Sequence, residues 1–208
     1  MPESEPEEKI QPPAPAASSD PYWTRGYWGP INPDENPAVL AVRQRFPDAY
    51  EDAINFRDEM TIRVKRDSLR DVVEFLRDHP DLRYNLLTDL TAVDMLRLRD
   101  VPRFDVVVQL YSIPRRVRLR VKAGLDDGEA VPSLTPIFAA ANWFERECYD
   151  MFGITFEEHP NLRRILLADD WDEGHPLRKD YPLRGYREYI QPGFEAPAPR
   201  VHSRLRRP

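Results

Sequence analysis

The sequence predicts an α+β fold: a single domain with a mixed or antiparallel β-sheet and packed helices, plus extended N- and C-terminal arms. Two observations support this prediction. Three segments alternate apolar and polar residues with a period of two, at 60–65, 104–110 and 117–122, as half-buried strands do. Apolar residues recur at helical spacing before and after these segments. At 208 residues, the chain is also long enough to bury a substantial core.

The first half of the domain is expected to form a helix, a strand and a second helix. Asn36-Pro37 is typical of an N-cap followed by the first helical position, so a helix should run from there to about Phe46. Residues 60–65 then alternate and predict a strand. The second helix is expected after the cap-like pair Asp67-Ser68, because apolar residues recur at helical intervals up to Leu76.

The second half is expected to continue the sheet and close with a third helix. Residues 82–95 are less periodic and predict a strand with an irregular continuation. Residues 104–110 and 117–122 are joined by a short link, which predicts an antiparallel pair. Thr135-Pro136 again fits an N-cap and a first helical turn, so we expect a helix from there to about Phe152, ended by Gly153.

The densest group of functional side chains lies between Glu145 and Pro182, in the run ERECYDMFGITFEEHPNLRRILLADDWDEGHPLRKDYP. We call these residues the signature loop (145–182), because prolines and the turn residues Gly153 and Gly174 indicate that much of the run is loop. It contains no familiar catalytic spacing. Its candidate site residues are Glu145, Arg146, Glu147, Asp150, Gly153, His159, Pro160, Arg163, Arg164, Gly174, His175, Pro176, Arg178, Lys179, Asp180 and Pro182.

The signature loop resembles the signature of the C subunit of proton-pumping NADH:quinone oxidoreductase, respiratory complex I. That family shows Glu-Arg-Glu, Asp-Met/Leu-Phe/Tyr-Gly, His-Pro-x-Leu-Arg-Arg-Ile-Leu and Gly-His-Pro-Leu-Arg-Lys-Asp in this order. Here they are Glu145–Glu147, Asp150–Gly153, His159–Leu166 and Gly174–Asp180. Before Glu145 the resemblance is only one of length and element order. The family usually has Gly where this chain has Glu158, so we expect that turn to differ locally.

The resemblance implies a cofactor-free subunit in the peripheral arm of the complex. Its main partner would be the D-type, hydrogenase-like subunit, near the B-type and other peripheral-arm subunits. The complex passes electrons from NADH to quinone and couples this to proton pumping, with FMN and iron–sulfur clusters in other subunits. The implied location is the cytoplasmic face of a prokaryotic inner membrane, reached only through the complex. An equivalent scaffold subunit of a related membrane-bound hydrogenase complex is the alternative.

Composition excludes several other classes of protein. The formal net charge of −6 argues against nucleic acid as a partner, because phosphate binding needs a basic face. A single cysteine, Cys148, excludes an internal disulfide and a self-contained iron–sulfur cluster, which typically takes four thiolates. The longest uncharged stretch, residues 130–144, is too short to span a bilayer, and the acidic start of the chain predicts no signal peptide.

The candidate catalytic groups each have a structural interpretation that we favour. His159 and His175 lack zinc-site spacing and precede proline, so we expect rigid turns whose imidazoles bond to the backbone or to a carboxylate. Cys148 lies on an apolar helix face and fits a buried small hydrophobe better than a nucleophile. Glu145, Glu147 and Asp150 on the same helix are expected to form surface salt bridges with Arg146, Arg163 or Arg164. The competing hypothesis is a free-standing, metal-dependent hydrolase.

The two ends of the chain differ in charge. Residues 1–35 form a Pro- and Glu-rich tail whose aromatic cluster at 22–28 is expected to be a docking patch. Residues 36–182 form the domain. Residues 183–208 form a basic, Pro-rich arm that we expect to become ordered along a partner subunit. The high arginine and proline content fits a thermophilic source or a GC-rich genome equally well.

Overall fold

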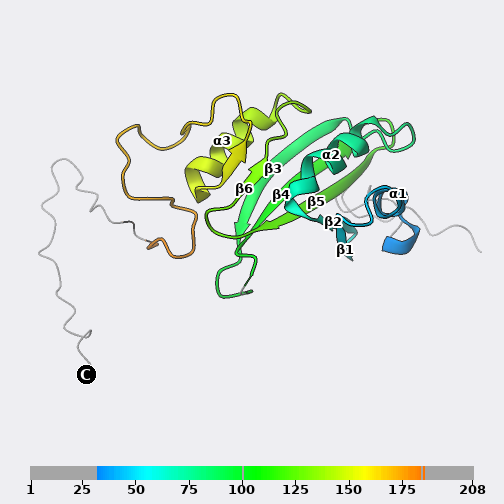
Figure 1. Cartoon of the computed structure of the whole chain (residues 1–208), viewed down its shortest axis with the longest axis horizontal. Helices are drawn as coiled ribbons and strands as arrows, with labels where there is room; N and C mark the ends of the chain where they lie inside the picture. The colour runs from blue at the N-terminus through cyan, green and yellow to red at the C-terminus, as the bar shows by residue number, and fades with distance from the viewer. Residues whose placement is uncertain (1–31, 100, 184, 186–208) are drawn as a thin grey trace, which may run out of the picture.

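The computed structural model describes residues 32–99, 101–183 and 185, and confirms the α+β class (Figure 1). The aromatic cluster at 22–28 and nearly all of the C-terminal arm lie outside these residues. A five-stranded mixed sheet with the order β1-β2-β5-β4-β3 forms the centre. Helix α2 lies across one face of the sheet, and α3 lies beside β3 at the end from which the signature loop continues.

The sheet is mixed because one of its four strand pairs is parallel. Its strands are β1 (Tyr50–Phe56), β2 (Glu59–Val64), β3 (Leu86–Asp94), β4 (Phe104–Ser112) and β5 (Val117–Leu125). The predicted antiparallel pair of β4 and β5 is present, with Val108 opposite Val121. β2 runs parallel to β5, and the remaining neighbours are antiparallel. A separate two-stranded parallel sheet joins β6 (Ala130–Pro132) to β7 (Thr155–Glu157).

The core lies between the sheet and the helices α1 (Pro37–Arg45), α2 (Leu69–Asp78) and α3 (Ala141–Phe152). Asn36 caps α1 as predicted, since its side chain accepts the N–H of Ala38 at 2.9 Å. The predicted apolar stripe of α2 is buried throughout. Cys148 is a core residue, as expected, with 1% of its surface exposed, and burial raises the pKa of its thiol. No helix in the described part of the chain is long and apolar enough to cross a membrane.

Two features of the first half were not predicted correctly. Strand β1 was missed because it is an edge strand without a buried residue: polar Glu51 and Asp52 and apolar Ile54 and Phe56 are all exposed, so its apolar alternation is weak. It turns into β2 through Arg57 and Asp58, which both have positive φ. Ser68 was expected to cap α2, but its side chain makes no capping hydrogen bond. Instead, a short 3₁₀ turn, η2 (Arg66–Ser68), leads into the helix.

The third helix begins at Ala141, so its predicted start at Thr135-Pro136 is wrong. Thr135 does not cap a helix because its hydroxyl oxygen lies 2.8 Å from Ser133 Oγ, which also accepts the Thr135 N–H. The N–H of Leu134 is held by Glu145 from the helix itself, and residues 134–140 form turns instead. The predicted end of the helix is correct, since Gly153 adopts a left-handed conformation with φ of 78°.

Candidate functional site

Asp150 of α3 holds the irregular part of the signature loop. Its Oδ2 accepts the backbone N–H groups of Ile165, Leu166 and Leu167 at 3.0, 2.8 and 2.8 Å. Burial alone would raise the pKa of this carboxyl, but the three N–H groups outweigh it and lower the pKa. The predicted surface salt bridges of Asp150 are therefore a misassignment. Its side chain is fully buried and serves to fix backbone that lies 15–17 residues further along the chain.

The other oxygen of Asp150 faces Arg164 without a hydrogen bond. Among the described residues Oδ1 has no hydrogen-bond partner, and Arg164 Nε lies 3.9 Å away. The guanidinium of Arg164 instead donates to the carbonyl oxygen of Trp171 at 2.6 Å. The expected ion pair with Arg164 is thus present only at long distance, and Arg164 mainly ties two parts of the loop together.

Arg146 reaches from α3 to the same loop. Its Nε and Nη2 donate to the carbonyl oxygens of Arg163 and Arg164, both at 3.1 Å. The guanidinium also stacks over Trp143, 5.3 Å from the ring centroid. Arg146 is buried, so it orients the loop from within, whereas the side chain of Arg163 is exposed.

Glu145 and His159 meet in the interior. Glu145 accepts Ser133 Oγ–H at 2.7 Å and the Leu134 N–H at 2.6 Å, and burial raises its pKa to about 7. His159 Nδ1 accepts the Asn161 N–H at 3.0 Å, so Nε2 carries the proton and donates to the Asn142 carbonyl oxygen at 3.3 Å. Burial lowers the His159 pKa, which keeps the ring neutral at 4.0 Å from the Glu145 carboxyl.

His175 holds the far end of the loop against α3. Its Nδ1–H donates to the carbonyl oxygen of Asp150 at 2.8 Å, and its ring packs directly on Gly153. A Cβ atom at Gly153 would lie 2.6 Å from this ring. Both histidines therefore bond to backbone groups, as predicted. No group of three or more His, Cys, Asp or Glu side chains in the described part of the chain could hold a metal ion.

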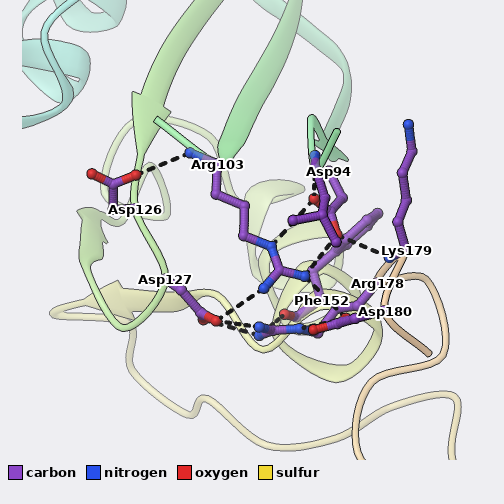
Figure 2. Close-up of polar contacts among 9 residues, drawn as sticks. Asp94, Arg103, Asp126, Asp127, Phe152, Arg178, Lys179 and Asp180 are labelled. Atoms are coloured by element: carbon purple, nitrogen blue, oxygen red, sulfur yellow. Dashed lines mark hydrogen bonds and ion pairs between the residues drawn. The ribbon is translucent and has the colours of Figure 1, made fainter. Parts of the chain in front are cut away.

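An ion-pair network joins the end of the signature loop to the sheet (Figure 2). Asp94, at the end of β3, accepts Arg103 Nη2 at 3.0 Å and the backbone N–H of Lys179 at 2.9 Å. Burial opposes ionisation of Asp94, but Arg103 and the backbone donors dominate and lower its pKa. Arg103 also pairs with Asp180 at 3.0 Å. Residues 179–180 are thereby held by side chains that come from the other half of the domain.

Arg178 completes this network. It forms a two-point ion pair with Asp127, with Nη1 at 3.0 Å from Oδ1, and stacks over the buried ring of Phe104 at 5.3 Å. Arg103 stacks on the same ring at 4.8 Å. Asp94, Arg103 and Asp127 were not among the residues predicted from the sequence. Asp94 could have been recognised, because it occupies one of the alternate positions of β3 that face the core. A buried carboxylate without a partner costs free energy, so a partner is expected there.

Glu158 lies in the left-handed region, with φ of 60°. Glycine adopts this conformation without strain, which gives a physical reason for glycine at this position. In this chain the Glu158 carboxylate pairs with Arg70 of α2 at 2.5 Å. Arg70 also donates to the carbonyl oxygen of Ser133, so the pair ties the loop entrance to α2 and β6.

The structure brings the candidate residues together around the C-terminal half of α3, but they differ in exposure. Buried are Glu145, Arg146 and Asp150; half-buried are Gly153, His159, Arg164, His175, Pro176, Arg178 and Pro182; exposed are Glu147, Pro160, Arg163, Gly174, Lys179 and Asp180. Apolar side chains face outward beside them: Trp143 is 60%, Leu166 61% and Leu177 51% exposed. The polar groups thus fix the loop from inside, and the outer surface formed by the loop and the adjoining Trp143 combines leucine, tryptophan and arginine.

Residues 62–187 match a family model described as respiratory-chain NADH dehydrogenase, 30 Kd subunit. The chain is 52% identical over 153 residues to the C subunit of NADH-quinone oxidoreductase from Citrifermentans bemidjiense, covering 73% of this chain and 92% of that protein. The corresponding C subunit from Roseiflexus castenholzii is 47% identical over 151 residues, which cover 72% of this chain and 85% of the relative.

Two solved structures resemble the fold. A trypsin-resistant fragment (1-134) of Nqo5 has 29% sequence identity and a TM-score of 0.50, covering 60% of this chain and 96% of the fragment. A chain of the membrane-bound sulfane sulfur reductase, an archaeal respiratory membrane complex, has 25% identity and a TM-score of 0.57. That match covers 70% of this chain and 84% of the other.

Proposed function

Because this chain belongs to the family of the 30 Kd subunit of respiratory-chain NADH dehydrogenase, we propose that it is a non-catalytic scaffold subunit of NADH:quinone oxidoreductase. It holds no redox cofactor and supports electron transfer from NADH to quinone, coupled to proton pumping. FMN and the iron–sulfur clusters belong to other subunits. Its main partner is the D-type, hydrogenase-like subunit, with the B-type subunit nearby. The complex holds it on the cytoplasmic face of the membrane.

One observation carries this proposal: the buried carboxylates and both histidines of the signature loop already make contacts within the chain. Asp150 binds three backbone N–H groups, and both histidines bond to backbone atoms. A general acid or base must come within hydrogen-bond reach of a substrate proton. Glu145 has a raised pKa, but it is fully buried and already accepts two hydrogen bonds. These groups therefore shape a surface.

That surface has the chemistry of a protein interface. Leu166 and Leu177 project from two segments of the loop that are fixed to Asp150 and to the Met151 carbonyl of the same helix end. Large exposed apolar side chains beside arginine and tryptophan are typical of binding hot spots. Because the backbone beneath them is already held, little ordering would be required on binding, which favours a stable complex.

Arg163 offers a direct test, because its side chain is exposed and only its backbone takes part in the loop contacts. The Arg163→Ala chain should unfold within about 0.5 kcal/mol of the wild type. In solubilised membranes, however, less of the complex should be assembled, while the turnover of each assembled complex stays unchanged. Arg115→Ala is the matched control. Arg115 is exposed in the turn between β4 and β5, at the end of these strands opposite Phe104, on which Arg178 of the signature loop stacks. Normal assembly with lost turnover would instead place Arg163 in the chemistry.

The subunits that copurify with this chain show whether it belongs to NADH:quinone oxidoreductase or to a related membrane-bound complex. The likeness to a chain of the sulfane sulfur reductase favours, as the alternative, an equivalent scaffold role in a related membrane-bound complex, including the hydrogenase type. An NADH-binding flavin subunit in the pull-down supports our proposal, and a large subunit with a nickel site supports the alternative. Stoichiometric iron, zinc or flavin in the purified chain would contradict the scaffold role and revive the hypothesis of a metal-dependent hydrolase.

A further inference from the structure

The loop between β3 and β4 carries two aliphatic side chains that are open to solvent. It spans residues 95–103, and the structure describes all of them except residue 100. Leu98 is 68% and Val101 69% exposed, more than any apolar side chain on the surface that we assign to the partner of the signature loop. Exposed aliphatic groups that occur together mark interaction sites more often than single ones do. We call residues 95–103 the hairpin tip.

Hydrogen bonds hold the hairpin tip in one shape. The guanidinium of Arg99 donates twice to the carbonyl oxygen of Pro102, at 2.9 and 2.7 Å, and pairs with the buried carboxylate of Asp105 at 2.7 Å. The N–H of Leu98 donates to the backbone carbonyl oxygen three residues earlier, at 2.8 Å. Leu98 adjoins Arg99 in the chain and Val101 adjoins Pro102, so each exposed side chain stands next to a residue of this clamp.

Packing against the sheet fixes the hairpin tip further. The ring of Pro102 lies so close to Gly124 of β5 that a Cβ atom at Gly124 would overlap with it. At the base of the loop, the N–H of Met95 donates to the carbonyl oxygen of Arg103 at 2.8 Å. Arg97 has a positive φ of 69°, a strained conformation for a residue with a side chain, which persists only where the surroundings impose it. Because the tip is formed in advance, binding through it would cost little ordering.

The hairpin tip lies at the same end of the sheet as the end of the signature loop (Figures 1 and 2). Asp94, which directly precedes the tip, accepts the backbone N–H of Lys179 at 2.9 Å, and Arg103 pairs with Asp180 at 3.0 Å. The exposed Leu177 lies two residues before Lys179. The tip and the outer surface of the signature loop are therefore joined by direct contacts and present apolar groups on both sides of the junction.

The junction itself can be covered without leaving a charge alone. The side chains of Arg103 and Arg178 are already largely enclosed, whereas about half of Asp127 and Asp180 remains exposed. Each of the two arginines already pairs with both of these carboxylates. A protein that spans the junction would thus remove paired charges from water and leave none of these four groups buried without a partner.

The two apolar regions also share their chemistry. Arg97 is exposed next to Leu98 on the hairpin tip, and Arg163 is exposed near Leu166 on the signature loop. Aliphatic groups beside an arginine fit a pocket that is apolar inside and has carboxylates at its rim, since arginine pairs with carboxylates through two hydrogen bonds. One partner surface with this pattern repeated would accept both regions.

We propose that the hairpin tip is a second docking element, which inserts Leu98 and Val101 into an apolar pocket of the same partner subunit that binds the signature loop. The partner spans the junction and presents carboxylates to Arg97 and Arg163. This inference rests on the proposed scaffold function and adds a contact region from the other half of the domain.

Site-specific photo-cross-linking in the assembled complex tests the proposal. The photoreactive amino acid p-benzoylphenylalanine replaces Leu98, Leu166 or Ile113, one at a time, in the full chain. The solubilised complex is illuminated, and mass spectrometry identifies the attached subunit. Positions 98 and 166 should attach to the same subunit. Position 113 is the control and should not attach to it, because Ile113 is 55% exposed in the turn at the other end of β4, about 26 Å along the strand.

Serine variants measure how much the contact matters. Leu98→Ser should lower the amount of assembled complex several-fold, and the addition of Val101→Ser should lower it further, because each change places a hydroxyl in an apolar pocket. The isolated variants should unfold at the same urea concentration as the wild type, since both side chains are exposed in the free chain. Ile113→Ser is the matched control and should assemble normally.

The outcomes separate this inference from the proposed function. A cross-link at position 166 without one at position 98 would overturn the second docking element and leave the scaffold role standing. Attachment of position 98 to a different subunit, to a lipid or to a second copy of this chain would do the same. Normal assembly of the double serine variant would also contradict the inference. A chain that copurifies with no other subunit would overturn both.

Discussion

Asp150 is a buried carboxylate on which three consecutive backbone N–H groups of the signature loop converge. Asp150→Ala removes this acceptor and leaves the N–H groups of residues 165–167 without their partner. The rest of the loop is still held by Arg146 and His175, so the domain should fold while residues 165–167 open more readily.

The magnitude follows from the contacts. A hydrogen bond to a charged group contributes about 1.5–3 kcal/mol. The three bonds share one oxygen and are not additive. Within the described part of the chain, Oδ1 makes no hydrogen bond whose loss would add to the cost. Breaking a buried charged network usually costs about 3–5 kcal/mol, which is the loss we expect for Asp150→Ala. Asp150→Asn keeps a carbonyl acceptor without the charge and should lose about half as much.

Urea unfolding of the full chain gives the global free energy, and amide hydrogen exchange of Ile165, Leu166 and Leu167 reports on the loop. A loss of about 4 kcal/mol corresponds to roughly a thousandfold increase in exchange at these amides. Glu147→Gln is the control, since Glu147 lies on the same helix but is exposed, and it should stay within about 0.5 kcal/mol of the wild type. Unchanged exchange at all three amides in Asp150→Ala would refute this account of the loop.

Two further predictions concern buried positions around α3. The pKa of Glu145 rises from 4.5 to about 7 on folding, so between these pH values the folded state holds the extra proton. As pH rises through this window, the free energy of unfolding of the wild type should fall by about 3 kcal/mol relative to that of Glu145→Gln. Urea midpoints measured against pH test this, and parallel curves for the two proteins would disprove it. Gly153→Ala should lower stability by about 3 kcal/mol, because it adds a clash with His175 to the cost of positive φ. Gly128 has φ of 85°, and apart from its chain neighbours no atom of the described residues lies within 4 Å of a Cβ atom added there. Gly128→Ala should therefore lose only about 1 kcal/mol, and equal losses for the two variants in thermal unfolding would show that the His175 contact does not matter.

The local elements of this protein were predictable from short stretches of sequence. Alternation identified β4 and β5, Asn36-Pro37 marked the start of α1, and Gly153 marked the end of α3. Each signal reports a property of neighbouring residues, such as a cap, a period or a positive φ, and needs no distant partner. The motif spacing of the signature loop identified the family for the same reason, because spacing is a property of the sequence itself.

The roles of the charged residues depended on tertiary structure. Glu145 and Asp150 looked like surface groups of a helix, but residues 133–134 and 165–167 fold back over them and supply N–H and O–H donors. The start of α3 was misplaced because the same Glu145 takes the N–H of Leu134.

The network that holds Arg178 and Asp180 was also beyond local patterns, since Asp94, Arg103 and Asp127 come from strand ends and loops 51–86 residues earlier in the chain. A buried carboxylate is stabilised where hydrogen-bond donors or cations surround it, and a buried guanidinium where acceptors or carboxylates do. Sequence alone therefore identified which residues carry the signature. Only the packing of distant segments decided which of them are enclosed and which, like Arg163 and Leu166, remain on the surface.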